Sequence, residues 1–577
     1  MAEQITFEFE QRPTIKGFPE LHWTGKRPYR STQYYPAQLR ESYGQETNGW
    51  MNKVFWGDNL QVMSHLLNDY RGKIDLIYID PPFDSKADYK KKIDIRGVGK
   101  AISDSSSFEE KQYGDIWTND EYLQFMYERL ILLKEMLKEG GSIYLHCDWH
   151  KSHYLRAIMD EVFGPNNFRN EIIWYYRRWN IASTQYATNH DSLLFYTKEG
   201  AKHTYNQLYI PKSEKSSAQG KSWKSVIGED GVRRSIQTDE PTKGVPMPDV
   251  WEISMINPVA KERTEIGYPT QKPEALLERI ITASSNPGDI VFDCFMGSGT
   301  TQAVAMKLGR RFIGADINLG AIQTTTKRLL KVANSLNTPS LDELNPKYIG
   351  FEVYNVNNYD FFRNPVEARD LLISALEIQP FSQTNLWDGE LDGRMVKIMP
   401  VNRIATKADL QSLIENLPYK TYEKRKEEAP HEPVERITIV CMGHEPELKG
   451  ALEQELSDYK VDIQIVDILR DKSELQLKRD SEAEIVREGD KLIIRAFYPM
   501  NLLQKLSIQK EYVEDWRQMV DSIMIDWNFD GVVMQPSVTD VPAKNEMVIG
   551  IYDIPEDAGT IKVKITDVLS ESLEVEV

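Results

Sequence analysis

The segment KIDLIYIDPPFDSK, Lys73–Lys86, places an acid, two prolines and an aromatic residue directly after an apolar run. The run over residues 76–79 is uninterrupted and partly β-branched, which favours a strand covered on both faces of a parallel sheet. Asp80 then falls at the carboxyl end of that strand, where open α/β sheets bind ligands, so its carboxylate is placed for chemistry. A plain strand-ending turn would use the same residue types, and this segment alone leaves both interpretations open.

A second segment, VFDCFMGSGTT at residues 291–301, has the pattern of a strand, a tight turn and the start of a helix. Gly297 and Gly299 would let the backbone turn sharply and approach a ligand that a Cβ atom would displace. The segment is not the dinucleotide fingerprint G-x-G-x-x-G, because Gln302 occupies the place of the third glycine. Asp316 ends the next predicted strand, where an acid can accept hydrogen bonds from a ribose.

The elements that must position these residues alternate between strands and helices. Apolar runs indicate the strands, and apolar residues spaced by three and four indicate the helices. In chain order we predict a strand from residue 53, a helix over 60–70, a strand over 76–79, helix 121–139 ended by Gly140 and Gly141, strand 142–148 and helix 151–164. Residues 271–333 continue as helix, strand, glycine turn, helix, strand and helix. This alternation predicts a parallel, doubly wound α/β sheet.

Composition and charge restrict the class of protein. The chain has 577 residues, which predicts two to four domains at about 100–200 residues per domain. Three cysteines cannot form a disulfide framework, and we find neither a signal-type apolar region nor a run of about 18 apolar residues, so we expect a cytoplasmic protein that does not contact a membrane. The net charge of −18 divides into +1 for residues 1–335 and −19 for residues 336–577. This balance argues against nucleic-acid binding by the whole surface, but it leaves room for a local cleft.

Taken together, DPPF at Asp80–Phe83, DCFMGSGTT at 293–301 and YPTQKP at 268–273 resemble the amino-group DNA methyltransferases that use S-adenosylmethionine. That family has an acid, Asn or Ser before Pro-Pro-aromatic, and a Phe-x-Gly-x-Gly turn for the cofactor. The catalytic motif comes first here, which resembles the β group with its type III restriction-system modification subunits. The resemblance spans residues of about 50–335. It implies a Rossmann-like, S-adenosylmethionine-dependent methyltransferase fold with permuted motif order.

The resemblance implies a role for each residue of the first motif. Asp80 would accept one N–H of an exocyclic amine on a base, and the backbone carbonyl of Pro81 would accept the other. Pro81 and Pro82 fix φ and so preorganise these acceptors. Phe83 would stack on the base, which must be flipped out of duplex DNA before its amine can react.

Further contacts follow from the same resemblance. Trp174 or Tyr175 would help to hold the flipped base, although both could equally be core aromatics. Arg177 and Arg178 suit phosphate contacts. The residues that would bind S-adenosylmethionine are Asp58, Asn59, Lys272, Asp293, Phe295, Gly297, Gly299, Thr300 and Asp316. Cys294 departs from the family, which usually has proline there.

The predicted organisation follows from these assignments. It comprises an N-terminal arm at 1–50, a methyltransferase domain at 51–335 and an additional acidic C-terminal α/β region at 340–577. Within the methyltransferase domain we predict a catalytic half at 51–180, a target-recognition insert at about 181–266 and a cofactor half at 267–335. A linker near 422–436 would divide the C-terminal region.

Several alternatives stay open at this stage. The acid in the catalytic motif favours adenine N6 over cytosine N4, but both reactions share the pocket chemistry. C5-cytosine chemistry is set aside because no cysteine follows a proline. The cluster HCDWHKSH, with His146, Cys147, His150 and His153, resembles a metal-ligand set, yet we predict no metal site because it spans a strand end and a helix start. RNA or protein methylation is a weaker competitor.

The partners expected from the resemblance are double-stranded DNA and a separate restriction subunit that carries helicase and nuclease activity. The acidic final third would be the surface on which that subunit, or a second copy in a homodimer, docks. An alternative hypothesis is that the chain is chiefly a DNA-recognition or assembly subunit and that methylation is secondary. The predicted insert is shorter than is typical of type III subunits, so an orphan or other defence-linked methyltransferase is also open.

Overall fold

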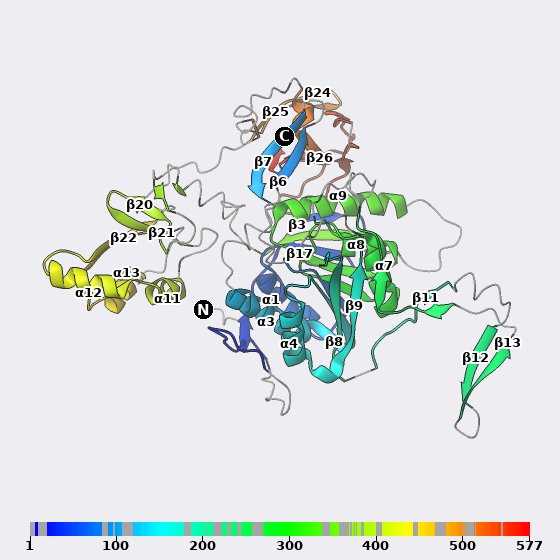
Figure 1. Ribbon diagram of the computed structural model, residues 1–577. Helices are drawn as coiled ribbons and strands as arrows, with labels where there is room; N and C mark the ends of the chain where they lie inside the picture. The colour runs from blue at the N-terminus through cyan, green and yellow to red at the C-terminus, as the bar shows by residue number, and fades with distance from the viewer. Residues whose placement is uncertain are drawn as a thin grey trace. The chain divides into compact units, whose positions relative to one another are not determined.

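The computed structural model divides the chain into two compact units (Figure 1). One unit comprises Met1–Ser85, Thr118–Val356 and Asp530–Pro536, and the other comprises Lys86–Trp117, Asn357–Phe529 and Ser537–Val577. The residues that the structure describes are 6–9, 20–82, 90–95, 99–106, 119–177, 186–200, 202–211, 222–227, 232–238, 244–256, 268, 270–336, 347–356, 369, 372–373, 376, 378–381, 386–399, 405, 407–441, 448–467, 481–499, 502–503, 513, 515–543, 546–569 and 571–577.

The first unit is built on a ten-stranded sheet, parallel from β8 through β18. β10 and β3 run antiparallel to their neighbours, and β15 is parallel to β9. From edge to edge the strands are β15 (Val250–Glu252), β9 (Phe168–Tyr175), β10 (His190–Thr197), β8 (Leu137–Cys147), β5 (Ile74–Ile79), β16 (Ile290–Asp293), β17 (Arg311–Asp316), β4 (Asn52–Trp56), β18 (Phe351–Asn355) and β3 (Gln38–Tyr43).

Two groups of helices cover the two faces of this sheet (Figure 1). One group is α1 (Asn59–Tyr70), α3 (Asn119–Met136) and α4 (Ser152–Phe163), and the other is α7 (Glu274–Ser284), α8 (Thr300–Lys307) and α9 (Leu319–Leu336). Because it is covered on both faces, β5 is buried at all six positions, as its uninterrupted apolar run predicted. The predicted α/β fold with a parallel sheet is confirmed.

Short elements complete the first unit. They are β1 (Thr6–Glu8) paired with β2 (Ser31–Gln33), β11 (Tyr209–Ile210) paired with β14 (Val245–Pro246), the ribbon of β12 (Ser222–Ile227) and β13 (Arg233–Thr238), and the 3-10 turn η1 (Pro165–Asn167). At the open edge of the sheet, the backbone N–H of Met534 donates to Arg40 and its carbonyl accepts from Ser42, at 3.0 Å each. The segment Asp530–Pro536 therefore continues the hydrogen bonding of β3.

Among the described residues, the second unit contains two larger hydrophobic cores beside two smaller clusters. One lies under a sheet of β19 (Gln379–Pro380), β20 (Gly389–Leu391), β21 (Arg394–Ile398), β22 (Glu435–Cys441) and β23 (Val461–Asp467), with helices α11 (Lys407–Glu415), α12 (Tyr419–Glu428) and α13 (Leu448–Glu455). The other is shared by β24 (Glu482–Glu488), β25 (Lys491–Tyr498) and β28 (Ile551–Asp553) with β27 (Val538–Asp540), β26 (Val520–Asp526), β29 (Lys562–Asp567) and β30 (Ser572–Glu576). The 3-10 turn η2 (Trp516–Met519) and the pair β6 (Lys90–Ile95) and β7 (Gly99–Ser106) complete this unit.

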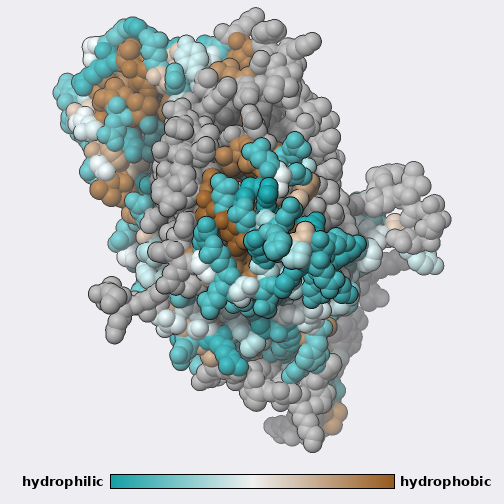
Figure 2. All heavy atoms as spheres, turned by 90° about the vertical axis from the view of Figure 1, so that its left-hand side faces the viewer, coloured by the Kyte–Doolittle hydropathy of each residue, from teal (hydrophilic) through white to brown (hydrophobic). Residues whose placement is uncertain are grey.

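On the face shown in Figure 2, hydrophilic side chains cover most of the described surface, and hydrophobic ones gather in separate patches. No helix among the described residues combines the length and the apolar character needed to cross a bilayer.

The structure differs from the predicted boundaries in five places. β10 and β15 belong to the central sheet although both fall in the expected insert at 181–266, and β3 belongs to it although it falls in the expected arm at 1–50. β18 joins the same sheet from beyond residue 335. These strands are short or mixed in polarity and pair with partners distant in sequence, so local periodicity did not identify them.

The other two differences concern a linker and a helix end. The expected linker at 422–436 instead contains most of α12 and the start of β22, and Tyr422 is fully buried in the core. Helix α3 ends at Met136, and Gly140 and Gly141 lie within β8 rather than at the end of the helix.

The side chain of Asn52 links β4 by hydrogen bonds to β17 and to the segment before β18, and a substitution at this position tests that role. Its buried amide donates to the carbonyls of Tyr348 and Gly350, at 2.8 and 2.9 Å, and accepts from the N–H of Phe312 and the Trp50 indole, at 2.8 and 2.9 Å. Asn52→Leu would remove this partner from the Tyr348 carbonyl, the Phe312 N–H and the Trp50 indole, at about 1–3 kcal/mol each, whereas the Gly350 carbonyl keeps the backbone N–H of residue 52. We expect the free energy of unfolding in urea to fall by at least about 3 kcal/mol.

Asn68→Leu is the matched control, because Asn68 is an exposed asparagine on α1 whose amide donates a hydrogen bond to the neighbouring Asp69. It should change the free energy of unfolding by less than about 0.5 kcal/mol. Equal effects of the two substitutions would contradict the structural role of Asn52.

Candidate active site

The two sequence motifs meet at one edge of the central sheet. β5 and β16 are parallel neighbours, with Leu76 opposite Val291 and Ile77 opposite Phe292. Asp80 follows the carboxyl end of β5, and the glycine turn follows the carboxyl end of β16. Parallel pairing therefore brings the acid and the turn side by side, although more than 200 residues separate them in the sequence.

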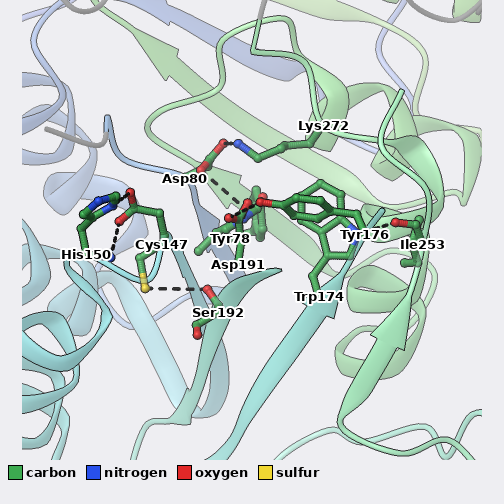
Figure 3. A network of polar contacts seen from close by, with 12 residues as sticks. Tyr78, Asp80, Cys147, His150, Trp174, Tyr176, Asp191, Ser192, Ile253 and Lys272 are labelled. Atoms are coloured by element: carbon green, nitrogen blue, oxygen red, sulfur yellow. Dashed lines mark hydrogen bonds and ion pairs between the residues drawn. The ribbon is translucent and has the colours of Figure 1, made fainter. Parts of the chain in front are cut away.

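Asp80 lies in a mostly buried position with its two oxygens in different environments (Figure 3). Oδ2 forms an ion pair with the ammonium of Lys272, in the segment before α7, and both side chains are only about one-sixth exposed. Oδ1 is buried and accepts no hydrogen bond from the described residues. Pro81 is buried and Pro82 half-buried, whereas Phe83 lies outside the described residues. The sequence placed Lys272 near the cofactor, and the structure shows that it also contacts the catalytic motif.

A network of polar side chains that sequence reasoning missed lies beside Asp80. His146, near the end of β8, is fully buried, and its Nδ1 atom lies 3.8 Å from Oδ1 of Asp80. The hydroxyl of Tyr78 lies 2.8 Å from the same Nδ1, and Nε2 lies 3.1 Å from Asp191 of β10. Asp191 also accepts a 2.8 Å hydrogen bond from Tyr176 (Figure 3). The acid and imidazole at neighbouring strand ends were visible in the sequence, but Asp191 lay in the expected insert.

The protonation of this network follows from its contacts. Burial raises the pKa of Tyr78 well above its usual value, and the nearby charge of Asp80 adds to the effect, so Tyr78 keeps its proton and donates to Nδ1 of His146. For Asp191, burial acts to raise the pKa, but the hydrogen bond from His146, the charge of Lys272 and the hydrogen bond from Tyr176 together lower it by more. The net pKa of Asp191 lies below its ordinary value. Asp191 is therefore a carboxylate that accepts the Nε2 proton.

The residues expected to hold a base or DNA lie in different environments. Trp174 is buried, donates its indole N–H to the carbonyl of Ile253 at 2.8 Å, and packs edge-on against His146, with ring centres 5.5 Å apart. Its position is that of a core aromatic, the alternative that the sequence left open, and a base contact by Trp174 stays a prediction. Tyr175 is half-buried, and Arg177 is exposed, with Glu252 at 3.5 Å. Arg178 lies outside the described residues.

The glycine turn has a backbone conformation that residues other than glycine rarely adopt. Gly297 and Gly299 have φ values of 49° and 69°. A Cβ atom on Gly299 would lie 2.5 Å from the methyl carbon of Thr325. Asp316, at the end of β17, accepts the N–H of Gly297 at 2.9 Å and that of Asn318 at 2.8 Å. The acid predicted to bind a ribose therefore also fixes the turn.

Asp293 occupies the start of the turn and stabilises it from within. Its carboxylate accepts the N–H of Phe295 at 3.0 Å and the hydroxyl of Thr301 at 2.6 Å. Complete burial raises its pKa to about 7, in spite of these hydrogen bonds, and burial likewise raises the pKa of Asp316 to about 6. The Thr300 hydroxyl accepts a 2.8 Å hydrogen bond from Arg328.

Asp58 and Asn59 join the start of α1 to the turn. Asp58 caps the helix by accepting the N–H of Leu60 at 2.9 Å, and it pairs with Arg129 of α3 at 3.1 Å. Asn59 accepts from Arg129 at 2.5 Å and donates to the carbonyl of Cys294 at 3.3 Å. Both predicted cofactor residues therefore have structural partners on the turn side of the site.

The donor set fits S-adenosylmethionine better than a metal ion. Gly297 and Gly299 form a tight turn at positive φ, carboxylates that could accept from an ammonium or a ribose stand around it, and Phe295 is half-buried. Among the described residues, no three His, Cys, Asp or Glu side chains converge as metal ligands. In the HCDWHKSH segment, His146 pairs with Asp191, whereas His150 pairs with Asp148.

Comparisons with known proteins agree with this arrangement. A family model described as "DNA methylase" matches residues 74–327. The type II methyltransferase M.HpaI of Haemophilus parainfluenzae is 33% identical over 280 residues, which cover 48% of this chain and 74% of that protein. The DNA adenine methyltransferase YhdJ of Escherichia coli (strain K12) is 29% identical over 278 residues, which cover 48% of this chain and 83% of that protein. The Mod subunit of the type III restriction-modification enzyme StyLTI of Salmonella typhimurium (strain LT2) is 26% identical over 327 residues, which cover 44% of this chain and 50% of that protein.

Gly299→Ala tests the crowding of the turn. A side chain at positive φ costs about 1–2 kcal/mol, and the approach of Thr325 should add about 1–3 kcal/mol. Gly72→Ala is a matched control, because Gly72 has the same φ of 69° but open space around its Cβ position. In urea unfolding, Gly299→Ala should therefore destabilise the chain more than Gly72→Ala does. Equal losses would show that Thr325 does not constrain the turn.

The raised pKa of Asp293 predicts a pH-dependent stability. The unfolded carboxyl ionises near its ordinary pKa of 3.8, whereas the folded one ionises near 7, so the free energy of unfolding falls as the pH rises between these values. Asp293→Asn cannot ionise and should remove this part of the slope. The difference in the free energy of unfolding between the unsubstituted chain and Asp293→Asn should change by up to about 4 kcal/mol between pH 4 and pH 8.

Denaturant unfolding at several pH values measures this difference. Asp69→Asn, at an exposed position on α1, serves as the control and should give a curve parallel to that of the unsubstituted chain. A parallel curve for Asp293→Asn would contradict the assignment.

Proposed function

Because this chain belongs to the DNA methylase family, we propose that it transfers a methyl group to the N6 amino group of a flipped adenine in duplex DNA. The methyl donor of the family is S-adenosylmethionine. The observation that carries the proposal is the pairing of β5 with β16, which puts Asp80 beside the glycine turn. An acceptor for an amine and a cradle for the methyl donor thus share one sheet edge.

The chemistry requires acceptors because an exocyclic amine donates its nitrogen lone pair into the ring and is a poor nucleophile. Oδ1 of Asp80, which accepts no hydrogen bond from the described residues, would take one N–H, and the carbonyl of Pro81 would take the other. Two acceptors favour a pyramidal nitrogen whose lone pair is free to attack. Prolines 81 and 82 hold both acceptors in place before the base arrives.

The cofactor residues of this chain would hold and orient the methyl donor. When bound, S-adenosylmethionine supplies an electrophilic methyl group on a cationic sulfur. The turn at Gly297 and Gly299 would admit it closely, and Asp316 would accept hydrogen bonds from its ribose. Lys272 pairs with the other oxygen, Oδ2, and so would leave Oδ1 to the amine.

Adenine is favoured over cytosine by two observations. The catalytic motif begins with an acid, whereas serine is commoner in the cytosine N4 enzymes. One relative is named a DNA adenine methyltransferase. Cytosine N4 methylation in the same pocket is the second candidate.

A restriction-modification role and a partner subunit form a further part of the proposal. One relative is the Mod subunit of a type III restriction-modification enzyme, although it matches only 44% of this chain. Residues 336–577 carry a net charge of −19 and lie entirely outside the matched family model. An acidic module of this kind would bind a basic surface on a helicase-nuclease subunit or on a second copy, and not DNA itself.

Asp80→Ala tests the catalytic assignment. Loss of the amine acceptor should lower the single-turnover rate of methyl transfer to duplex DNA by about 10²–10³-fold, while cofactor binding is retained. Asp148→Ala is the matched control, because Asp148 follows β8 as Asp80 follows β5, but it pairs with His150. Methylation by Asp80→Ala at the rate of the control would overturn the mechanism.

The base is identified by digesting methylated duplex DNA to nucleosides and measuring their masses. We expect N6-methyladenosine, in its deoxy form, as the product. N4-methylcytosine alone would replace adenine with cytosine in the proposal, and transfer to RNA or protein in place of DNA would overturn it.

A further inference from the structure

His146 stands directly behind the proposed catalytic acid, on the neighbouring strand. Ile79 pairs with Leu145 between β5 and β8, so the next residues, Asp80 and His146, lie at the same level of the sheet edge. Asp191 comes from β10, the strand on the other side of β8. Three adjacent strands thus supply a carboxylate, an imidazole and a second carboxylate in a row.

The contacts of this row give His146 a defined tautomer. Nε2 carries the proton and donates to Asp191, while Nδ1 is a base that accepts from the Tyr78 hydroxyl. The ring is fixed by Trp174, which packs edge-on against it and is itself held by the carbonyl of Ile253. A purely structural histidine would be satisfied by these bonds. The additional observation is that Nδ1 also lies 3.8 Å from Oδ1 of Asp80, a buried oxygen without a hydrogen-bond donor among the described residues.

The proposed methyl transfer releases a proton at this oxygen. The amine nitrogen forms a bond to the methyl carbon, the carbon–sulfur bond breaks, and its electron pair stays on sulfur. The nitrogen is then positively charged and must lose one N–H proton. A carboxylate is a weak base, whereas a neutral imidazole is a stronger one, so a proton received by Asp80 has a favourable destination on His146.

We propose that His146, held by Asp191, accepts through Asp80 the proton that the target amine loses as it is methylated. The proton passes from nitrogen to Oδ1 of Asp80 and then to Nδ1 of His146, and the Tyr78 hydroxyl rotates so that its oxygen accepts from the new N–H. Asp191 stabilises the imidazolium through Nε2. This transfer requires the 3.8 Å between Oδ1 and Nδ1 to shorten to hydrogen-bond distance. His146 is thus a positioning and proton-accepting residue that acts through Asp80, and the inference rests on the proposed function.

The pH dependence of methylation distinguishes this role from a structural one. The titratable and charged groups around His146 are Tyr78 and Asp80 from β5 and its end and Asp191 from β10, with Tyr176 and Lys272 one contact further away. Because His146 must be neutral to accept a proton, the single-turnover rate of the full chain on duplex DNA should rise with pH along an acidic limb to a plateau.

His146→Gln should lower the plateau about 10–100-fold and abolish this acidic limb. Asp191→Asn, which keeps the size of the side chain, should lower the plateau by a smaller factor and move the limb toward lower pH, because the imidazolium loses its carboxylate. The second variant preserves the test if the first fails to fold. His150→Gln is the matched control in the same segment, with an exposed side chain paired to Asp148. It should keep the profile and the rate within about twofold.

Cofactor binding and the free energy of unfolding are measured on each variant in parallel. Cofactor binding that stays within about twofold, together with the loss of the limb, supports the relay. If the unsubstituted chain methylates DNA and His146→Gln or Asp191→Asn keeps its pH profile, this inference alone is overturned. If the unsubstituted chain transfers no methyl group to DNA, the proposed function fails, and the inference fails with it.

Discussion

The parallel pairing of β5 with β16 is the constraint on which the rest of the site depends. The register of these two strands sets the distance between Asp80, just beyond β5, and the glycine turn, just beyond β16. All residues of β5 and β16 are buried, so neither strand can slip without exposing apolar surface or moving side chains into the wrong layer. The hydrophobic core therefore fixes the geometry of polar groups that lie next to it.

Electrostatics is the second feature that organises the site. Carboxylates from separate elements surround the sheet edge, and two of them, Asp293 and Asp316, are buried deeply enough that their pKa values rise. Backbone N–H groups of the turn and the hydroxyl of Thr301 partly offset the cost of this burial. A region built in this way suits a ligand that brings positive charge, which agrees with a sulfonium methyl donor under the proposed function.

The sequence allowed prediction of those parts that depend on local pattern. The strand before Asp80, the glycine turn and the helices of both halves were identified because apolar periodicity and turn residues are local signals. The partnership of His146 with Asp191 depends on β10, which lies 45 positions further along the chain and pairs antiparallel in an otherwise parallel region. The apolar run from Leu193 to Tyr196 was the available signal, but polar surroundings concealed it. Trp174 was ambiguous for a different reason, since an aromatic side chain serves a core and a base equally well.

The segment Asp530–Pro536 has a consequence for how the catalytic unit is made. It supplies backbone partners to Arg40 and Ser42 at the exposed border of the large sheet, yet it is translated almost 500 residues after them. During synthesis, the rest of the first unit can fold long before the segment Asp530–Pro536 leaves the ribosome. Until then β3 presents unpaired amide and carbonyl groups of the kind that recruit other strands, and a shortened gene product ending after residue 356 would keep that border open permanently.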